Sequence, residues 1–129
     1  MGCKQENNKE CVLNDDMKQI YKDLETSDVI VFASPLHWWN ISSKIKVLID
    51  RLYCYIGTEK LYNKKMVVYI TGISEIPNSG YDISEQMLKE IFGYLGPAVE
   101  VCPISADDTR PVAKNEAAMK AAYEKGKNI

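Results

Sequence analysis

Two short runs of consecutive apolar residues constrain the fold of this chain more than any other feature. Residues 29–33 read VIVFA and residues 66–71 read MVVYIT, and both runs are rich in β-branched side chains. Continuous apolar runs of this length, bounded by turn residues, are typical of strands buried on both faces of a parallel sheet. A third run, residues 98–104, contains Glu100 and Pro103, so we expect it at the edge of the same sheet.

The segments around these strands carry the spacing of amphipathic helices. Apolar residues recur every three or four positions in four segments, which predicts helices over about residues 15–25, 43–56, 82–95 and 111–126. Helices that alternate with short strands in this order favour an α/β domain, in which crossover connections join parallel strands.

Composition narrows the class of protein. The chain has 129 residues, which is one domain's worth, and it carries a net charge of -2. The mild acidity excludes the basic footprint of a nucleic-acid-binding domain. Apolar runs stay far shorter than the ~20 residues of a membrane span. The polar first ten residues do not resemble a secretory signal, so we expect a cytoplasmic protein.

Cysteine and histidine limit the chemistry further. The four cysteines are Cys3, Cys11, Cys54 and Cys102, and no two are spaced C-x-x-C. Buried thiols are the default interpretation for Cys54 and Cys102. The single histidine, His37, excludes a multi-histidine metal site within one chain. We therefore nominate no metal ligand and no catalytic acid or base.

Two loops follow strands, at the sheet edge where α/β proteins bind ligands. They are residues 34–41 and residues 71–81, and the first contains His37, Trp38 and Trp39 in a row. Three adjacent rings would make a rigid shelf for a planar ligand. The alternative is that the tryptophans cover a sheet edge or a subunit interface. The residues alone leave both interpretations open.

The stretch ASPLHWWNISSKIKVLIDR, residues 33–51, resembles the family of NAD(P)H-dependent FMN reductases and iron–sulfur flavoproteins. That family shows Ser-Pro-hydrophobic-Tyr-Trp, followed by a helix with a lysine and a terminal Asp-Arg, matched here by Lys46, Asp50 and Arg51. The resemblance extends over about residues 1–105. His37 departs from the usual tyrosine; its imidazole is smaller and titratable, so we expect weaker or pH-sensitive stacking.

The resemblance implies a flavodoxin-like three-layer α/β/α fold with a parallel sheet, of which three strands are recognisable. It also implies FMN as cofactor and NAD(P)H as co-substrate, with a hydride passed to the flavin and on to a small acceptor. Lys46 and the pair Asp50 and Arg51 would support their helix and a dimer interface. The residues expected to bind the cofactor are Ser34, Pro35, Leu36, His37, Trp38, Trp39, Asn40, Thr71, Gly72 and Ile73.

One departure from the family is large. Its members begin with a strand and a Ser/Gly-rich loop that holds the FMN phosphate at a helix N-terminus, and this strand should precede Met1. We therefore expect an N-terminally truncated domain without a phosphate site. In the flavodoxin strand order the absent strand is central, so residues 28–34 would expose an apolar edge. Likewise Cys3 and Cys11 are too few for the iron–sulfur cluster of some members.

Two functions compete on these grounds. One is an FMN-dependent NAD(P)H oxidoreductase that acts on a small-molecule acceptor. The other is a truncated remnant without independent flavin binding, which acts through oligomerisation or a partner chain and forms a homodimer or higher oligomer through Val29, Val31 and Phe32. A receiver-like signalling domain and a serine hydrolase lack the residues they need.

Overall fold

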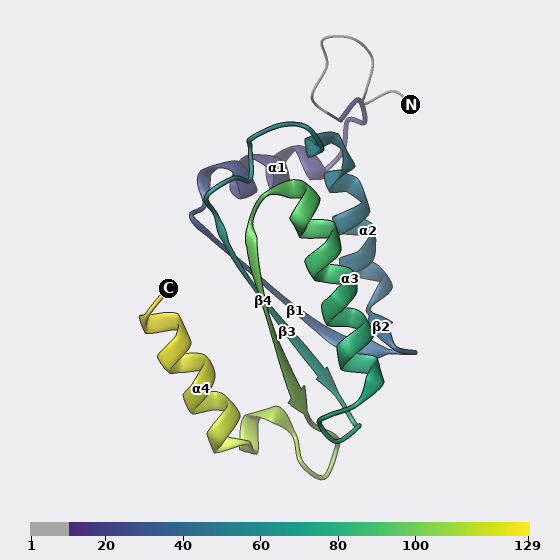
Figure 1. Cartoon of the computed structure of the whole chain (residues 1–129), viewed down its shortest axis with the longest axis vertical. Coiled ribbons are helices and arrows are strands. Elements are labelled where there is room, and N and C mark those ends of the chain that lie inside the picture. The colour runs from purple at the N-terminus through teal and green to yellow at the C-terminus, as the bar shows by residue number, and fades with distance from the viewer. Residues whose placement is uncertain (1–10) are drawn as a thin grey trace.

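The computed structural model describes residues 11–129 (Figure 1). Its elements follow in the order α1 (Met17–Thr26), β1 (Val29–His37), β2 (Asn40–Ile41), α2 (Ser43–Arg51), η2 (Leu52–Tyr55), β3 (Lys65–Gly72), α3 (Ser79–Leu95), β4 (Ala98–Ser105), η3 (Val112–Lys114) and α4 (Glu116–Lys127). The predicted alternation of helices and strands is confirmed. In this part of the chain no helix is both long and apolar enough to cross a membrane.

The sheet of the described residues has the order β2-β1-β3-β4. β1, β3 and β4 run parallel, with Phe32 opposite Val68 and Val68 opposite Val101. The short β2 returns antiparallel along the end of β1 and pairs Ile41 with Leu36. The parallel sheet and the edge position of β4 are therefore as expected, while β2 is an addition to the three strands that the sequence indicates.

Most of the core lies on one face of the sheet. α1, α2 and α3 pack there against alternate residues of the strands, and Val68, Leu88 and Phe92 have no exposed surface (Figure 1). Burying such side chains is the main favourable contribution to folding. α4 lies on the other face, where its Lys125 pairs with Glu100 of β4. The result is the three-layer arrangement expected of the fold.

The structure corrects two expectations about β1. The strand is buried on one face only, because the side chain of Val31 is 56% exposed and Ala33 is exposed as well. It also continues through Pro35 to His37, whereas the sequence predicts a loop from residue 34. Proline is tolerated where a strand has an unpaired edge. Among the described residues, none pairs with that edge of β1 before Leu36.

Two helix starts also differ from the predicted ones. α3 begins at Ser79, three residues before Asp82, because the side chain of Asn78 caps it by accepting a 2.9 Å hydrogen bond from the backbone N–H of Gly80. α4 begins at Glu116 behind an asparagine cap, whereas Pro111 only precedes the short η3 turn. Both caps are asparagines that the apolar periodicity does not reveal.

Candidate functional site

Two loops meet at the carboxyl ends of β1 and β3. They are the β1–β2 hairpin and the β3–α3 loop, and they enclose a cavity of about 300 Å³. The cavity is lined by Leu36, His37, Trp38, Trp39, Gly72, Ile73, Ser74, Asn78 and Gly80. Ligands of open α/β sheets bind at this edge.

The hairpin turn has an unusual backbone. Its central residues, Trp38 and Trp39, both have positive φ, at 45° and 61°. A two-residue hairpin needs this geometry, but asparagine and glycine usually supply it. For a bulky side chain the left-handed region costs roughly 1–2 kcal/mol per residue. Such strain is typical of functional sites, where the surrounding structure enforces it.

Contacts with α3 hold the strained turn in place. The indole N–H of Trp39 donates to the hydroxyl of Ser79 over 3.0 Å. The hydroxyl of Ser84, which is fully buried, donates to the backbone carbonyl of Trp39 over 3.2 Å. These bonds fix Trp39 against the helix and leave Trp38 as the outer residue of the turn.

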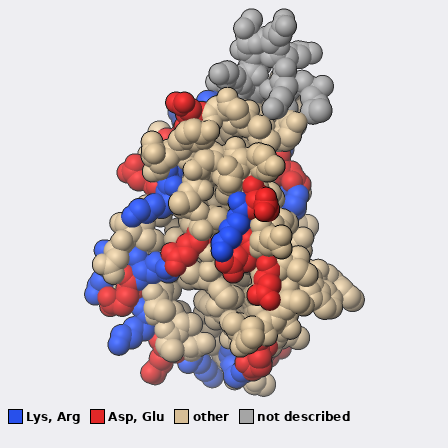
Figure 2. All heavy atoms as spheres, viewed as in Figure 1, with Lys and Arg blue, Asp and Glu red and all other residues tan. Residues whose placement is uncertain are grey.

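The hairpin presents aromatic surface to its surroundings. Trp38 is 90% exposed and Trp39 is 51% exposed, and their ring centroids lie 6.1 Å apart. In Figure 2 an uncharged protrusion stands out from the body where the β1–β2 hairpin ends in Figure 1. Across the cavity Ile73 is 77% exposed. Large apolar side chains exposed together indicate a binding surface.

Two glycines allow Leu36 to pack closely at the base of the cavity. A Cβ atom at Gly80 would lie 2.9 Å from Cδ2 of Leu36, and one at Gly72 would lie 3.1 Å from Cβ of Leu36. The first contact is shorter than real Cβ atoms make and the second is tighter than most, so glycine at these positions gives Leu36 room to pack between the loops. The resemblance indicated Gly72, whereas no pattern in the sequence singled out Gly80.

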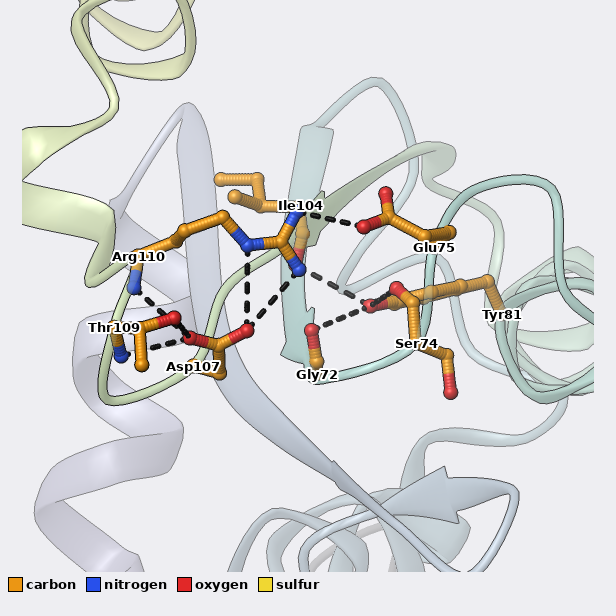
Figure 3. Close-up of polar contacts among 8 residues, drawn as sticks. All are labelled: Gly72, Ser74, Glu75, Tyr81, Ile104, Asp107, Thr109 and Arg110. Carbon is orange, nitrogen blue, oxygen red and sulfur yellow. Dashed lines mark hydrogen bonds and ion pairs between the residues drawn. The ribbon is translucent and has the colours of Figure 1, made fainter.

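A buried tyrosine anchors the second loop (Figure 3). The hydroxyl of Tyr81 donates to the carbonyl of Gly72 over 3.0 Å and also lies 3.3 Å from the carbonyl oxygens of Ser74 and Ile104. The side chain is 3% exposed, and its burial raises the pKa of the phenol. One hydroxyl therefore connects α3, the β3–α3 loop and the end of β4.

An ion-pair network joins the same loop to the segment after β4. Arg110 contacts Glu75 over 2.6 Å and Asp107 over 3.1 Å, as Figure 3 shows. Hydrogen bonds from Thr109 and Arg110 hold the pKa of the Asp107 carboxyl well below its usual range. The second loop is thus tied to its neighbours by polar contacts, and the hairpin presents apolar rings.

The structure brings together only part of the residues that the resemblance implies. Ser34 is 3% exposed, and its hydroxyl accepts from the backbone N–H of Ser42 instead of facing the cavity. Pro35 and Thr71 form a pair within the sheet. The side chain of Asn40 accepts from the N–H of Ile41. None of these four is among the cavity-lining residues. Ser74, Asn78 and Gly80 do line the cavity; they belong to the second predicted loop but not to the residues expected to bind the cofactor.

The helical residues singled out in the sequence form ion pairs. Lys46 pairs with Asp50 one turn along α2. Arg51 reaches Asp15 over 2.7 Å and so connects α2 to the segment before α1. Both contacts support the helix, as expected; a role in a dimer interface stays a prediction.

Comparison with known proteins identifies the family. Residues 2–106 match the family model of the NADPH-dependent FMN reductases. This chain belongs to that family. It is 36% identical over 63 residues to an iron–sulfur flavoprotein of Archaeoglobus fulgidus, over 46% of this chain and 29% of that protein. It is 31% identical over 91 residues to an FMN-dependent NADH:quinone oxidoreductase of Rhizobium meliloti, over 61% of this chain and 44% of that protein. The chain thus spans less than half the length of either relative.

Solved structures agree on the fold. The Trp repressor binding protein of Bacillus subtilis superposes with a TM-score of 0.69 at 21% identity, over 85% of this chain and 70% of that one. An FMN-dependent NADH-azoreductase of Bacillus anthracis, solved with FMN, gives a TM-score of 0.61 at 21% identity, over 84% of this chain and 57% of that one. A WrbA-like flavodoxin from Agrobacterium tumefaciens has a TM-score of 0.60. The fold is therefore flavodoxin-like.

The cavity suits one part of the FMN molecule. Its apolar and aromatic walls and its glycine base fit a flat, largely apolar ring. Its lining includes His37 but neither lysine nor arginine, the side chains that most often bind phosphate. The chemistry of this lining therefore fits the isoalloxazine ring better than the phosphate.

Proposed function

We propose that this chain binds the isoalloxazine ring of FMN between the β1–β2 hairpin and the β3–α3 loop, and serves in electron transfer from NAD(P)H to a small acceptor. The observation that carries the proposal is the pair Trp38 and Trp39, exposed on a strained turn that borders the cavity. When bound, the flavin supplies the capacity to take up a hydride from the nicotinamide and pass the electrons on.

The chain's own residues position the ring. Trp39 is fixed by Ser79 and Ser84, so it offers a rigid apolar wall. Trp38 stands free enough to lie over a bound ring and exclude water from it. Backbone groups of the β3–α3 loop, which Tyr81 holds in place, would be available to the polar edge of a bound ring. No side chain has to act as acid or base in this arrangement.

Flavin binding can be followed through the protein's own fluorescence. Both tryptophans of the chain belong to the site, so quenching during titration reports binding there. We expect FMN to quench the emission in a saturable way. No quenching at millimolar FMN would overturn the proposal.

A matched pair of glycine variants tests the location. Gly80→Val places a side chain against Leu36 in the cavity, and we expect flavin affinity to fall about tenfold, or about 1.4 kcal/mol. Gly93→Val lies in the same helix, where a Cβ meets nothing within 4 Å. Equal losses in both variants would show that the cavity is not the binding site.

The absence of a phosphate site is also a proposal, and riboflavin tests it. Because riboflavin is FMN without the phosphate, the two should bind within about threefold of each other if only the ring is held. FMN binding that is tighter by a factor of about 30, or about 2 kcal/mol, would overturn this part of the proposal.

A second candidate function rests on a different observation. The edge of β1 facing away from β3 has no partner strand over residues 29–35 among the described residues, and Val31 is 56% exposed there. Unpaired apolar edges are prone to associate. The chain would then act as an oligomer or with a partner chain. Phe32 would contribute little to the contact, because only 9% of its surface is still exposed in the single chain.

Sedimentation distinguishes the two candidates. Association through β1 predicts a dimer or larger species that dissociates in Val31→Lys, whereas Val47→Lys, at an equally exposed valine on α2, leaves it intact. A monomer that binds flavin would favour the oxidoreductase and overturn the association.

A further inference from the structure

A second cavity lies at the end of the molecule occupied by α1, remote from the β1–β2 hairpin (Figure 1). Its volume is about 420 Å³, and residues of α1, η2 and the segment before α1 line it. Two cysteines, Cys11 and Cys54, share this cavity although they lie 43 positions apart. The basic side chains of Lys18, Lys22 and Lys60 and the carboxylate of Glu25 stand around it.

Cys11 sits in surroundings that stabilise a thiolate. An Nη2–H of Arg51 lies 3.3 Å from its sulfur. A backbone hydrogen bond at Leu13, together with contacts to the side chains of Arg51 and Tyr21, lowers the pKa of the thiol, against the opposing effect of burial. A thiolate next to a cation and within reach of solvent is the reactive form of cysteine.

Cys54 faces the same group of atoms from the other side. It is 4% exposed, and its sulfur lies 3.5 Å from the backbone carbonyl of Arg51. The hydroxyl of Tyr21 donates to that same carbonyl over 2.7 Å, and burial together with the neighbouring thiols of Cys54 and Cys11 raises the pKa of this phenol. Both thiols therefore border one small polar cluster.

The cluster also contains a buried donor, Nε of Arg51. Within residues 11–129 this atom makes no hydrogen bond. Buried donors are almost always satisfied, so an unsatisfied one calls for an explanation. An oxygen atom added to the nearby sulfur of Cys11 would be an acceptor for it.

We propose that Cys11 and Cys54 form a dithiol that hydrogen peroxide oxidises to an intramolecular disulfide, with Cys11 reacting first. Cys11 belongs to a segment without helix or strand, so local backbone movement can bring its sulfur to the bonding distance of Cys54. The site lies apart from the flavin cavity and does not depend on the proposed function.

The chemistry takes place in two steps. The Cys11 thiolate attacks one oxygen of hydrogen peroxide; an S–O bond forms, the O–O bond breaks, and the departing hydroxide takes up a proton to become water. The sulfur of Cys54 then attacks that of Cys11; the S–S bond forms, the S–O bond breaks, and the leaving hydroxide becomes water with the proton of the Cys54 thiol. The two thiols lose two electrons in total, and peroxide gains them.

Peptide mapping of the oxidised chain tests the pairing. The chain is treated with one equivalent of hydrogen peroxide, the remaining thiols are alkylated, and the peptides are identified by mass spectrometry. We expect a Cys11–Cys54 linked pair and an alkylated Cys102, whose pKa burial raises. Overturning results are a Cys11 that stays alkylatable, or a disulfide that joins Cys11 to another cysteine.

A trapping variant tests the order of events. In Cys54→Ser the disulfide cannot form, so Cys11 should remain as a sulfenic acid that dimedone labels. Cys102→Ser is the matched control and should form the Cys11–Cys54 disulfide at the rate of the unaltered chain. Labelling at Cys102 instead of Cys11 in Cys54→Ser would contradict the proposal.

The role of Arg51 has its own readout. In Arg51→Lys the planar guanidinium is lost, and we expect iodoacetamide to alkylate Cys11 with a midpoint at higher pH and peroxide oxidation to slow about tenfold. Asp15→Asn removes the ion pair of Arg51 but leaves the guanidinium beside the sulfur, so it should slow oxidation less. Equal slowing of oxidation in both variants would show that Arg51 acts through its ion pair with Asp15, and not by stabilising the thiolate of Cys11.

Discussion

The two loops around the cavity at the carboxyl ends of β1 and β3 differ in how their shapes are maintained. The β1–β2 hairpin places Trp38 and Trp39 in a backbone region that bulky residues rarely adopt, and most of its surface is apolar and exposed. The β3–α3 loop is held by the hydroxyl of Tyr81 and by the ion pairs of Arg110. One loop therefore supplies contact surface and the other supplies a fixed position. Substitutions should separate these two roles.

The largest effect on stability should come from the anchor of the second loop. Tyr81→Phe removes the hydroxyl from the carbonyls of Gly72, Ser74 and Ile104. The carbonyl of Gly72 keeps the N–H of Ala106 as a donor, so we expect a loss of about 0.5–1.5 kcal/mol, the net contribution of a typical hydrogen bond. Urea denaturation measures the loss. Tyr94→Phe, at a tyrosine that is 72% exposed on the same helix, serves as control and should change the unfolding free energy little. A similar loss in both variants would remove the special role of Tyr81.

The hairpin should show the opposite behaviour. Trp38→Asn replaces an exposed ring by a residue that tolerates positive φ, so the free energy of unfolding should change by less than about 1 kcal/mol. Riboflavin binding, followed through the remaining Trp39, should weaken about tenfold, or about 1.4 kcal/mol. A strongly destabilised variant that still binds riboflavin normally would reverse the comparison.

The smallest effect on stability should come from the loss of the Asp107 charge at low pH. Because the pKa of Asp107 is lowered on folding, its ionised form adds stability above its ordinary pKa of 3.8, and this contribution disappears as the pH falls further. Asp107→Asn should therefore be less stable than the unaltered chain at pH 6, and the gap should shrink below about pH 4. Urea unfolding across this range measures it. If the difference in unfolding free energy between the two proteins stays constant with pH, the effect of the substitution comes from packing and not from charge.

The fold was largely predictable from the sequence because its signals are local. The apolar runs of β1 and β3 and the spacing of α2 depend on neighbours along the chain, so periodicity reveals them. The exposure of Val31 was not predictable in this way, since a continuous apolar run looks the same whether one face or both faces of the strand are covered.

The site was predictable only where a motif carried it. His37, Trp38 and Trp39 stand out as three rings in a row after a strand, and the family pattern adds Gly72. The turn at Trp38 and Trp39 was hidden because its residues are not the usual Asn-Gly. Gly80 and Tyr81 act through contacts across the fold, and such contacts leave no trace in local spacing.

The small buried surface of α4 has a consequence for local unfolding of the molecule. In contrast to α1, α2 and α3, this helix has no buried residue; an asparagine cap and the pair of Lys125 with Glu100 are among its few ties. Elements with so little burial open at a free energy far below that of global unfolding. Its backbone amides should exchange with deuterium early, while those of β3, between two strands, remain protected until the whole sheet unfolds.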